Sequence, residues 1–240
     1  MAFTPVFHSE WIKIRTLRSQ IAALAMIPAM TALFSALASS DTGGDDFDPL
    51  FAVFFGVAFG QIAAIAFGTT AVSSEFQGGA LRLSLAAVPN RARWFAAKAV
   101  AIAVPVFIVG LVTGGVTLAV GRAVLGAEAD GLGGAEQVRG VVGCAVYLTL
   151  MALLAAGLTA VLRSGVATLS IVIPFLLIVS FVVGDASSDI ADLLPDRAGQ
   201  VALHQTWDGA MGPWVGLGVT ALWAAAALAA GAWSIRRRDA

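Results

Sequence analysis

The sequence predicts an all-α integral membrane protein with six transmembrane helices. Of its 240 residues, 59% are apolar and only 12% are charged, whereas soluble domains are about 25% charged. Six apolar stretches contain no Asp, Glu, Lys, Arg or His, and each approaches the roughly 20 residues that a helix needs to cross a bilayer. This composition excludes a disordered chain, a nucleic-acid-binding protein and an ordinary cytosolic enzyme. It leaves too little polar sequence for a separate soluble domain, so we expect residues 1–240 to form one transmembrane domain.

The elements follow one another in a simple order. An amphipathic helix over residues 5–18 precedes the first span. The segment 73–98 joins the second and third spans, and a helical segment over 185–213 precedes the last. The expected spans cover about residues 20–38, 49–72, 99–121, 140–162, 165–184 and 214–235.

The basic residues predict the orientation of these spans. If the N-terminus is inside and every span crosses once, the inner segments carry 11 Lys and Arg residues and the outer segments carry 3. Lys and Arg near the ends of spans favour the cytoplasmic side. Acidic residues show the opposite distribution, with 3 inside and 12 outside. We therefore expect both termini in the cytoplasm.

Two alternatives to this plan concern individual spans. Ala36-Leu37-Ala38 resembles a signal-peptidase site, although the apolar run before it is longer than a usual signal core. The fourth and fifth spans are separated only by Arg163 and Ser164, and one bent segment is the alternative to two spans with a tight inner turn. Together they are far too long for a single crossing, so we expect the turn.

The chain lacks the motifs of several kinds of chemistry. It has no GxxxxGK[ST] phosphate-binding loop and no HExxH zinc motif. Its single cysteine, Cys144, has no partner for an internal disulfide, and His8 and His204 fall on opposite sides of the expected membrane. We therefore expect no catalytic residues and no metal site. Because the spans also lack an ionisable group that could capture a coupling ion, any energy for transport must come from elsewhere.

Small and polar residues within the spans either serve contacts between helices or have a role in function. Gln61 needs a partner near mid-span, either on another helix or on a substrate path. Thr69, Thr113 and Thr117 are further candidates for lining such a path, although Thr hydroxyls commonly bond to their own helix. The GxxxG pairs allow helices to approach closely, and we expect them to pack inside the bundle rather than to form a dimer face. These pairs are Gly56/Gly60, Gly110/Gly114 and Gly212/Gly216.

The N-terminal helix has the pattern of an interfacial helix. Phe7, Trp11 and Ile14 recur at helical spacing, whereas Lys13 and Arg15 lie at other angles. An apolar stripe with aromatic rings and a basic flank favours a position among lipid headgroups. The alternative is a cytoplasmic flank that only sets topology.

The inner segment 73–98 contains a short amphipathic helix. Gly78-Gly79 and Pro89-Asn90 break the chain on either side of it. Leu81, Leu85 and Val88 share one face, which must rest on the membrane or on a partner because so short a helix is unstable alone. Glu75 and Arg82 are either solvated or paired with each other. Basic residues in this segment either bind anionic headgroups or serve a partner; they are Arg91, Arg93 and Lys98.

Three motifs in these segments resemble the type-2 permease subunits of ABC transporters, especially the compact bacterial exporter and antibiotic-resistance permeases. The first is Ser9-Glu10-Trp11-x-Lys13-x-Arg15. The second, and most specific, is Glu75-Phe76-x-Gly78-x-x-x-Arg82-x-x-Leu85-x-x-x-Pro89-x-Arg91, followed by Lys98. The third is Leu194-Pro195-x-x-Ala198-Gly199-Gln200. With six spans, the resemblance covers essentially the whole chain, but Gly79 stands where the family often has Thr or Ser.

The resemblance implies a function as well as a fold. Residues 75–91 look like the coupling helix that docks on the family's ATPase subunit. Two copies of that subunit are expected, and they would bind ATP and Mg. No cofactor is expected in this chain itself. It also implies a second permease copy, contact with membrane lipids, no nucleic-acid partner, and location in the bacterial cytoplasmic membrane. The expected cargo of the exporter is amphipathic or apolar, such as a peptide, an antibiotic or a lipid-like molecule. The alternatives are an ATP-independent scaffold, immunity factor or channel and, behind these, an ion-driven carrier. The residues expected at the coupling surface are Glu75, Phe76, Gly78, Gly79, Leu81, Arg82, Leu85, Val88, Pro89 and Arg91.

Overall fold

The computed structural model describes residues 3–40, 47–88, 90–179, 192–207 and 211–237. Within those ranges every regular element is helical. The long helices are α2 (Arg18–Ser39), α4 (Val57–Ser73), α6 (Arg91–Leu125), α7 (Gly134–Leu162) and α12 (Pro213–Arg237). The shorter ones are α1 (Phe3–Thr16), α3 (Pro49–Phe54), η1 (Ser74–Phe76), α5 (Ala80–Ala87), η2 (Gly126–Gly131), α8 (Gly165–Pro174), the π-helical turn η3 (Phe175–Val179), α11 (Pro195–Gln200) and η4 (Val201–Leu203).

Five helical segments are long and apolar enough to cross a membrane. They are Arg18–Ser39, Pro49–Phe76, Arg91–Leu125, Gly134–Leu162 and Pro213–Arg237. These segments make the described residues an all-helical structure with five candidate membrane-spanning helices, and they coincide with five of the six expected spans. The sixth is described only as the shorter apolar helix Gly165–Ile178, and residues 180–184 of its expected range lie outside the described residues. Six crossings and their orientation remain predictions.

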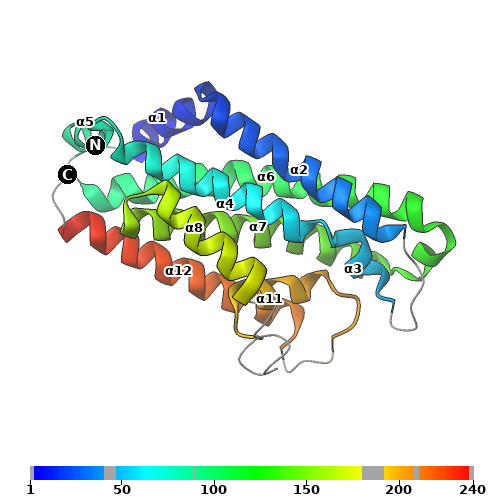
Figure 1. Ribbon diagram of the computed structural model, residues 1–240. Helices are drawn as coiled ribbons and strands as arrows, with labels where there is room; N and C mark the ends of the chain where they lie inside the picture. The colour runs from blue at the N-terminus through cyan, green and yellow to red at the C-terminus, as the bar shows by residue number, and fades with distance from the viewer. Residues whose placement is uncertain (1–2, 41–46, 89, 180–191, 208–210, 238–240) are drawn as a thin grey trace.

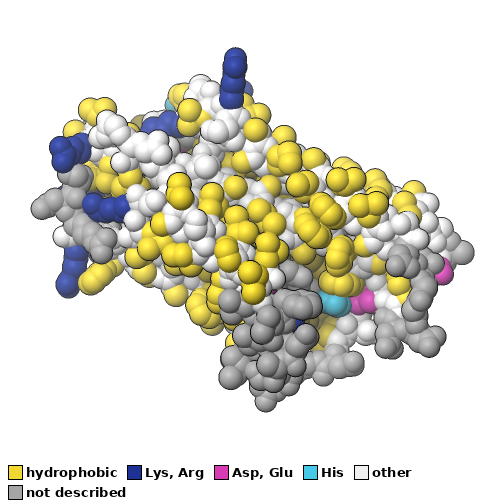
Figure 2. Space-filling view, in the orientation of Figure 1, with side chains coloured by type: hydrophobic (Ala, Val, Ile, Leu, Met, Phe, Trp, Pro, Cys, Tyr) yellow, Lys and Arg dark blue, Asp and Glu magenta, His cyan; other side chains and the backbone are white. Residues whose placement is uncertain are grey.

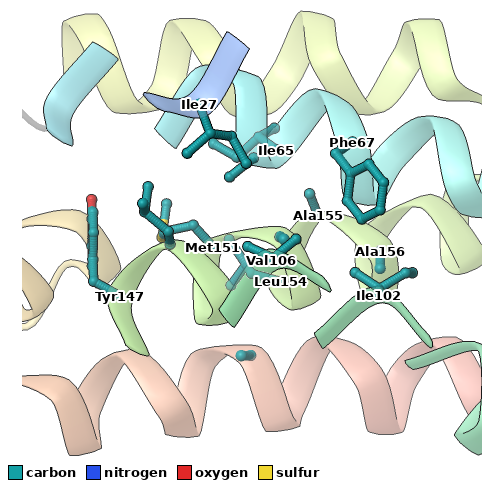
Figure 3. Close-up of a cluster of buried hydrophobic side chains, with 14 of the residues drawn as sticks. Ile27, Ile65, Phe67, Ile102, Val106, Tyr147, Met151, Leu154, Ala155 and Ala156 are labelled. Carbon is teal, nitrogen blue, oxygen red and sulfur yellow. The ribbon is translucent and has the colours of Figure 1, made fainter. Parts of the chain in front are cut away.

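Helix α7 lies at the centre of the bundle. It packs against α4, α6 and α12, while α2 lies on α4 and α6, and α8 contacts α4 and α7 (Figure 1). Large apolar side chains fill the space between these helices, with Ile27 of α2, Ile65 and Phe67 of α4, Ile102 of α6 and Met151 of α7 all fully buried (Figure 3). The core is therefore built by side chains from several spans around α7.

The second expected span is interrupted near its N-terminal end. Helix α3 stops at Phe54 and α4 begins at Val57. At the break, Gly56 lies against the backbone of α2 at Thr31, and its N–H donates to the Ser35 hydroxyl 3.0 Å away. A side chain at Gly56 would push α2 away, so this glycine sets the closest approach of the two helices.

The glycine pairs pack inside the bundle, as expected, with one exception. Gly56 and Gly60 face α2, Gly110 and Gly114 face α7, and Gly216 faces Ala198 of α11. Gly212, by contrast, has open space where a side chain would project.

The two ends of the bundle differ in charge and in content. One end carries α1, α5, the start of α6 and the end of α12, whereas α3 lies at the other (Figure 1). Arg91 at the start of α6 donates to the carbonyl of Ile235 in α12 at 2.8 Å. Figure 2 shows Lys and Arg side chains gathered near this first end and apolar side chains over much of the length of the visible face. We call the first end the α5 end and the other the α3 end.

Candidate functional site

A buried cluster of charges connects four elements at the α5 end. Lys98 in α6 is only 3% exposed and Glu75 in η1 only 2%. The Lys98 Nζ contacts Glu75 Oε1 at 2.6 Å and also pairs with Glu10 of α1. Lys13 of α1 reaches the same Glu75 oxygen at 2.8 Å, and the Ser84 hydroxyl of α5 donates to the other at 3.0 Å. We call Glu10, Lys13, Glu75, Ser84 and Lys98 the charge cluster.

Helical geometry explains how the cluster assembles. Glu10 and Lys13 lie three residues apart on α1, so both side chains project toward one side of the helix. Burial lowers the pKa of Lys13, but its hydrogen bond to Glu75 and the charge of Glu10 outweigh burial and hold that pKa above its ordinary value. The cluster therefore keeps Lys13 charged.

This arrangement corrects two expectations and assigns partners to a third residue. Glu75 is not a solvated loop charge, because its carboxylate is buried between two lysines. Lys98 does not face lipid headgroups, because it is buried. Lys13, expected at another angle from the apolar stripe of α1, pairs with Glu10 and Glu75 and is a member of the cluster. Sequence reasoning missed Glu10 and Ser84, and the only available signal was their place within the charged motifs.

Helix α5 is turned differently from the expectation. It starts at Ala80, after Gly78 (φ 60°) and Gly79 (φ 75°), whose left-handed conformations favour glycine. Leu81 is 5% exposed, and Leu85 and Val88 pack against the protein's own core. The apolar face expected to rest on a membrane or a partner is therefore covered by the chain itself.

The uncovered face of α5 carries a different set of residues. Leu83 is 74% exposed, and Arg82, Ala86 and Ala87 are exposed beside it. Phe76, by contrast, is partly buried against the core, with the Arg163 guanidinium 5.7 Å from its ring centre. Pro89 lies outside the described residues. Among the residues of this helix that were predicted to dock on a partner, Arg82 is exposed. Leu83 is also exposed, but it was not predicted as a docking residue from the sequence.

Helix α1 covers residues 3–16 rather than 5–18 and turns its face partly into the protein. Phe7 and Trp11 stack on each other with ring centres 6.2 Å apart and remain partly exposed. Ile14 is buried, and Arg15 is exposed. The interfacial position of the aromatic pair stays a prediction, whereas Ile14 belongs to the core.

A second candidate site is a cavity of about 560 Å³ between α3 and α4, η3, and the α11–η4 segment. Gln61, expected to find an interhelical partner or to line a path, lines this cavity and accepts a hydrogen bond from Tyr147 of α7. Gln200 of α11 donates to the same hydroxyl at 3.2 Å. Thr69, Thr113 and Thr117 are buried and do not line the cavity. Its described lining residues are Phe51, Phe55, Ala58, Phe59, Gln61, Leu176, Leu177, Asp192, Asp196, Arg197, Gln200, Val201 and His204.

Helix α11 brings polar residues deep between the spans. The Pro195 carbonyl accepts a 2.7 Å hydrogen bond from Thr220 inside α12, and Gly199 lies against the Tyr147 ring near the middle of α7. Asp196 is consequently only 6% exposed. The part of the expected outer segment that is helical in the structure, residues 195–203, therefore inserts beside α7 and α12. Residues 185–191 and 208–210 of the expected range lie outside the described residues. Sequence reasoning missed Tyr147 and Asp196 because their burial depends on this insertion.

Asp48 connects the start of α3 to the residues that directly follow η4. Its carboxylate caps α3 by accepting from the Phe51 N–H at 2.9 Å and accepts from the Gln205 N–H at 3.0 Å. The His204 Nδ1 lies 3.1 Å from the same carboxylate, and its ring stacks on Phe51. Burial raises the pKa of Asp48, but the hydrogen bonds from His204, Phe51 and Gln205 outweigh burial and hold that pKa below its ordinary value.

We expect the stability contributed by Asp48 to depend on pH. A lowered folded-state pKa stabilises the protein above the ordinary value of about 4, and this contribution disappears as the pH falls through the folded-state value. Asp48→Asn should therefore lower stability near neutral pH by about 1–3 kcal/mol and flatten the loss of stability in acid. Melting temperatures in detergent between about pH 7 and pH 3 check this. Asp130→Asn, on the exposed η2 turn, should leave the pH profile unchanged, and an equal flattening there would contradict the assignment.

Comparison of the chain with protein-family models and with curated protein sequences gives no match. Among the described residues, no group of three His, Cys, Asp or Glu side chains could hold a metal ion. Over the residues that the structure describes, the fold and the two sites thus define an all-helical protein with five candidate membrane-spanning helices, a charge-stabilised helix at one end, and a mainly apolar cavity with polar groups in its wall.

Proposed function

We propose that this chain is the permease subunit of an ATP-driven ABC exporter, with energy supplied by a separate ATPase subunit. The observation that carries the proposal is α5, a short helix held at the end of the bundle by buried charges with its other face uncovered. It lies within residues 75–91, the segment that resembles the coupling helix of type-2 permeases.

The charge cluster supports a mechanical role for α5. Ser84 of α5 is bonded to Glu75, which directly follows α4, and Glu75 is paired with Lys98 of α6. Ion pairs removed from water resist separation, because a partner left alone would be a buried unpaired charge. A force on α5 would therefore be transmitted to the second and third expected spans, and through Lys13 to α1.

The exposed face of α5 supports a protein partner for this helix. Leu83 is exposed at the α5 end of the molecule, and its neighbour Arg82 is basic. A leucine beside an arginine suits a cleft that has an apolar floor and an acidic rim. In the proposal this cleft belongs to the ATPase, which binds ATP and Mg, and the permease itself catalyses no reaction.

The remaining features of the proposal follow from the family resemblance. Two permease copies, identical in the simplest case, would flank a common path in the cytoplasmic membrane of a bacterium, with both termini inside. The amphipathic or apolar cargo would enter this path, and the cavity that Gln61 lines is the described space with a suitable mixture of polar and apolar walls.

We expect Leu83→Asp to abolish association with the cognate ATPase without unfolding the permease. A carboxylate placed in an apolar cleft loses its hydration, so the amount of ATPase that co-purifies in mild detergent should fall by about tenfold or more. Thr16→Asp is the matched control, since it adds the same charge at an exposed position of α1 at the same end.

Unchanged co-purification of the ATPase with Leu83→Asp would contradict the coupling role of α5. If the tagged wild-type chain retains no ATPase at all, the ATP-independent scaffold, immunity factor or channel becomes the better description. Leu81→Asp is unsuitable for this test, because Leu81 is buried in the chain's own core.

A further inference from the structure

The cavity between α3, α4, η3 and the α11–η4 segment has one aromatic wall. Three phenylalanine rings follow one another from α3 across the break into α4, with successive ring centres 5.8 and 6.0 Å apart: Phe51, Phe55 and Phe59. Each ring lies about one helical turn from the next, so together they form a continuous apolar surface. Aromatic faces attract both flat apolar groups and cations.

The opposite wall carries more acid than base among the described residues. Asp192 and Asp196 line the cavity together with one guanidinium, that of Arg197. His204 also lines it, but its ring already contacts the Asp48 carboxylate. Asp196 is nearly buried, and a carboxylate in such a position attracts a cation more strongly than a solvated one because the surroundings screen its charge less.

The volume of the cavity suits a small organic molecule. Its approximately 560 Å³ falls within the 300–1,000 Å³ typical of small-molecule sites, which are mainly apolar with a few placed polar groups. Leu176 of η3 also lines a second cavity of about 220 Å³ among apolar side chains of α7, α8 and α12. Leu176 separates the two cavities at this point, so an apolar substituent of a bound molecule could extend toward the second one.

From these observations we propose that this cavity is a binding site for an amphipathic aromatic cation. The flat part of the ligand lies on the Phe51–Phe59 wall, and its positive charge faces Asp196 and Asp192. The amides of Gln61 and Gln200 supply hydrogen bonds at the deep side. Binding itself does not depend on the proposed function, whereas identification of the ligand as transported cargo rests on it.

The test uses the purified full-length chain without any ATPase, in detergent, with ethidium as the probe. Fluorescence anisotropy should show saturable binding to the wild-type chain. Asp196→Asn keeps the side-chain shape but removes the charge, so its dissociation constant should rise about tenfold or more. Asp130→Asn, on the exposed η2 turn, is the matched control and should bind like the wild type.

Two further variants and a second dye keep the test decisive if Asp196→Asn does not fold. Asp192→Asn and Phe55→Ala alter partly exposed wall residues, and each should weaken ethidium binding severalfold while the melting temperature stays close to that of the wild type. The anionic dye fluorescein should bind more weakly than ethidium.

The proposal is overturned if the wild-type chain shows no saturable ethidium binding, if fluorescein binds equally well, or if the folded Asp192 and Phe55 variants bind ethidium like the wild type. Such results would leave the association of α5 with an ATPase untouched, so failure of this site and failure of the proposed function are distinguishable. If ATPase association is absent but ethidium binding is intact, the proposed function fails while the binding site stands.

Discussion

Replacing Lys98 with methionine should destabilise the protein by about 3–5 kcal/mol, the range found when one partner of a buried ion pair is removed. Lys98 separates two buried carboxylates, Glu10 and Glu75. Methionine fills a similar volume but leaves these acids to repel each other, with only the half-exposed Lys13 to compensate. The Lys98 ammonium also lies 5.7 Å from the centre of the buried Trp94 ring, and this contact is lost as well.

The melting temperature in detergent measures the effect, with Lys13→Met as the control. The Lys13 side chain is 40% exposed, so its loss should cost no more than about 1 kcal/mol. Adding Glu75→Gln to Lys98→Met should recover part of the stability, because the second change removes one of the two repelling charges. Equal melting temperatures for Lys98→Met and Lys13→Met would contradict the larger contribution that we assign to the buried Lys98.

The second large effect is expected at the contact between α6 and α7. A Cβ atom on Gly110 would lie 2.7 Å from the Ala145 Cα atom, which is closer than two carbon atoms pack. Because this obstacle is backbone, Gly110→Val must push the helices apart. We expect a loss of about 3 kcal/mol or more, at the upper end of overpacking effects, or failure to accumulate in the membrane.

Gly115→Val provides a matched control in the same helix. A side chain at Gly115 meets nothing within 4 Å, so the same substitution five residues further along α6 should leave the melting temperature nearly unchanged. Comparison of the two variants separates the packing effect from the helix propensity of valine. Similar melting temperatures for both would contradict a tight contact between α6 and α7 at this point.

Charge and hydropathy predicted the fold class because both depend on local composition. A stretch of about 20 residues without a charge has few alternatives to a membrane helix, and five of the six expected spans appear as long apolar helices. The helix between Gly79 and Pro89 was also predictable, since glycine and proline both interrupt helices locally. The contacts that the spans and this short helix make were not predictable. Periodicity shows which residues share a face of a helix, but it does not show what covers that face.

Helix α5 illustrates this limit. Leu81, Leu85 and Val88 were correctly placed on one face, but whether a membrane, a partner or the chain itself covers them depends on how α5 lies against the start of α6. The same applies to Gln61, whose need for a partner was evident from its depth, whereas Tyr147 and Gln200 were not identifiable as its neighbours. Residues from α4, α7 and α11 meet there only after the bundle has formed.

The sequence by itself determined an all-helical membrane protein, the approximate limits of its apolar helices, and the concentration of basic residues in particular connecting segments. These properties arise from the free energy of placing each residue in water or lipid, which is nearly additive along the chain. Only the tertiary structure decided that Glu75 and Lys98 are buried together, that Leu83 is the exposed apolar residue of α5, and that Asp196 lies beside a cavity. Those outcomes depend on distances between residues far apart in the chain, and such distances are set by helix packing.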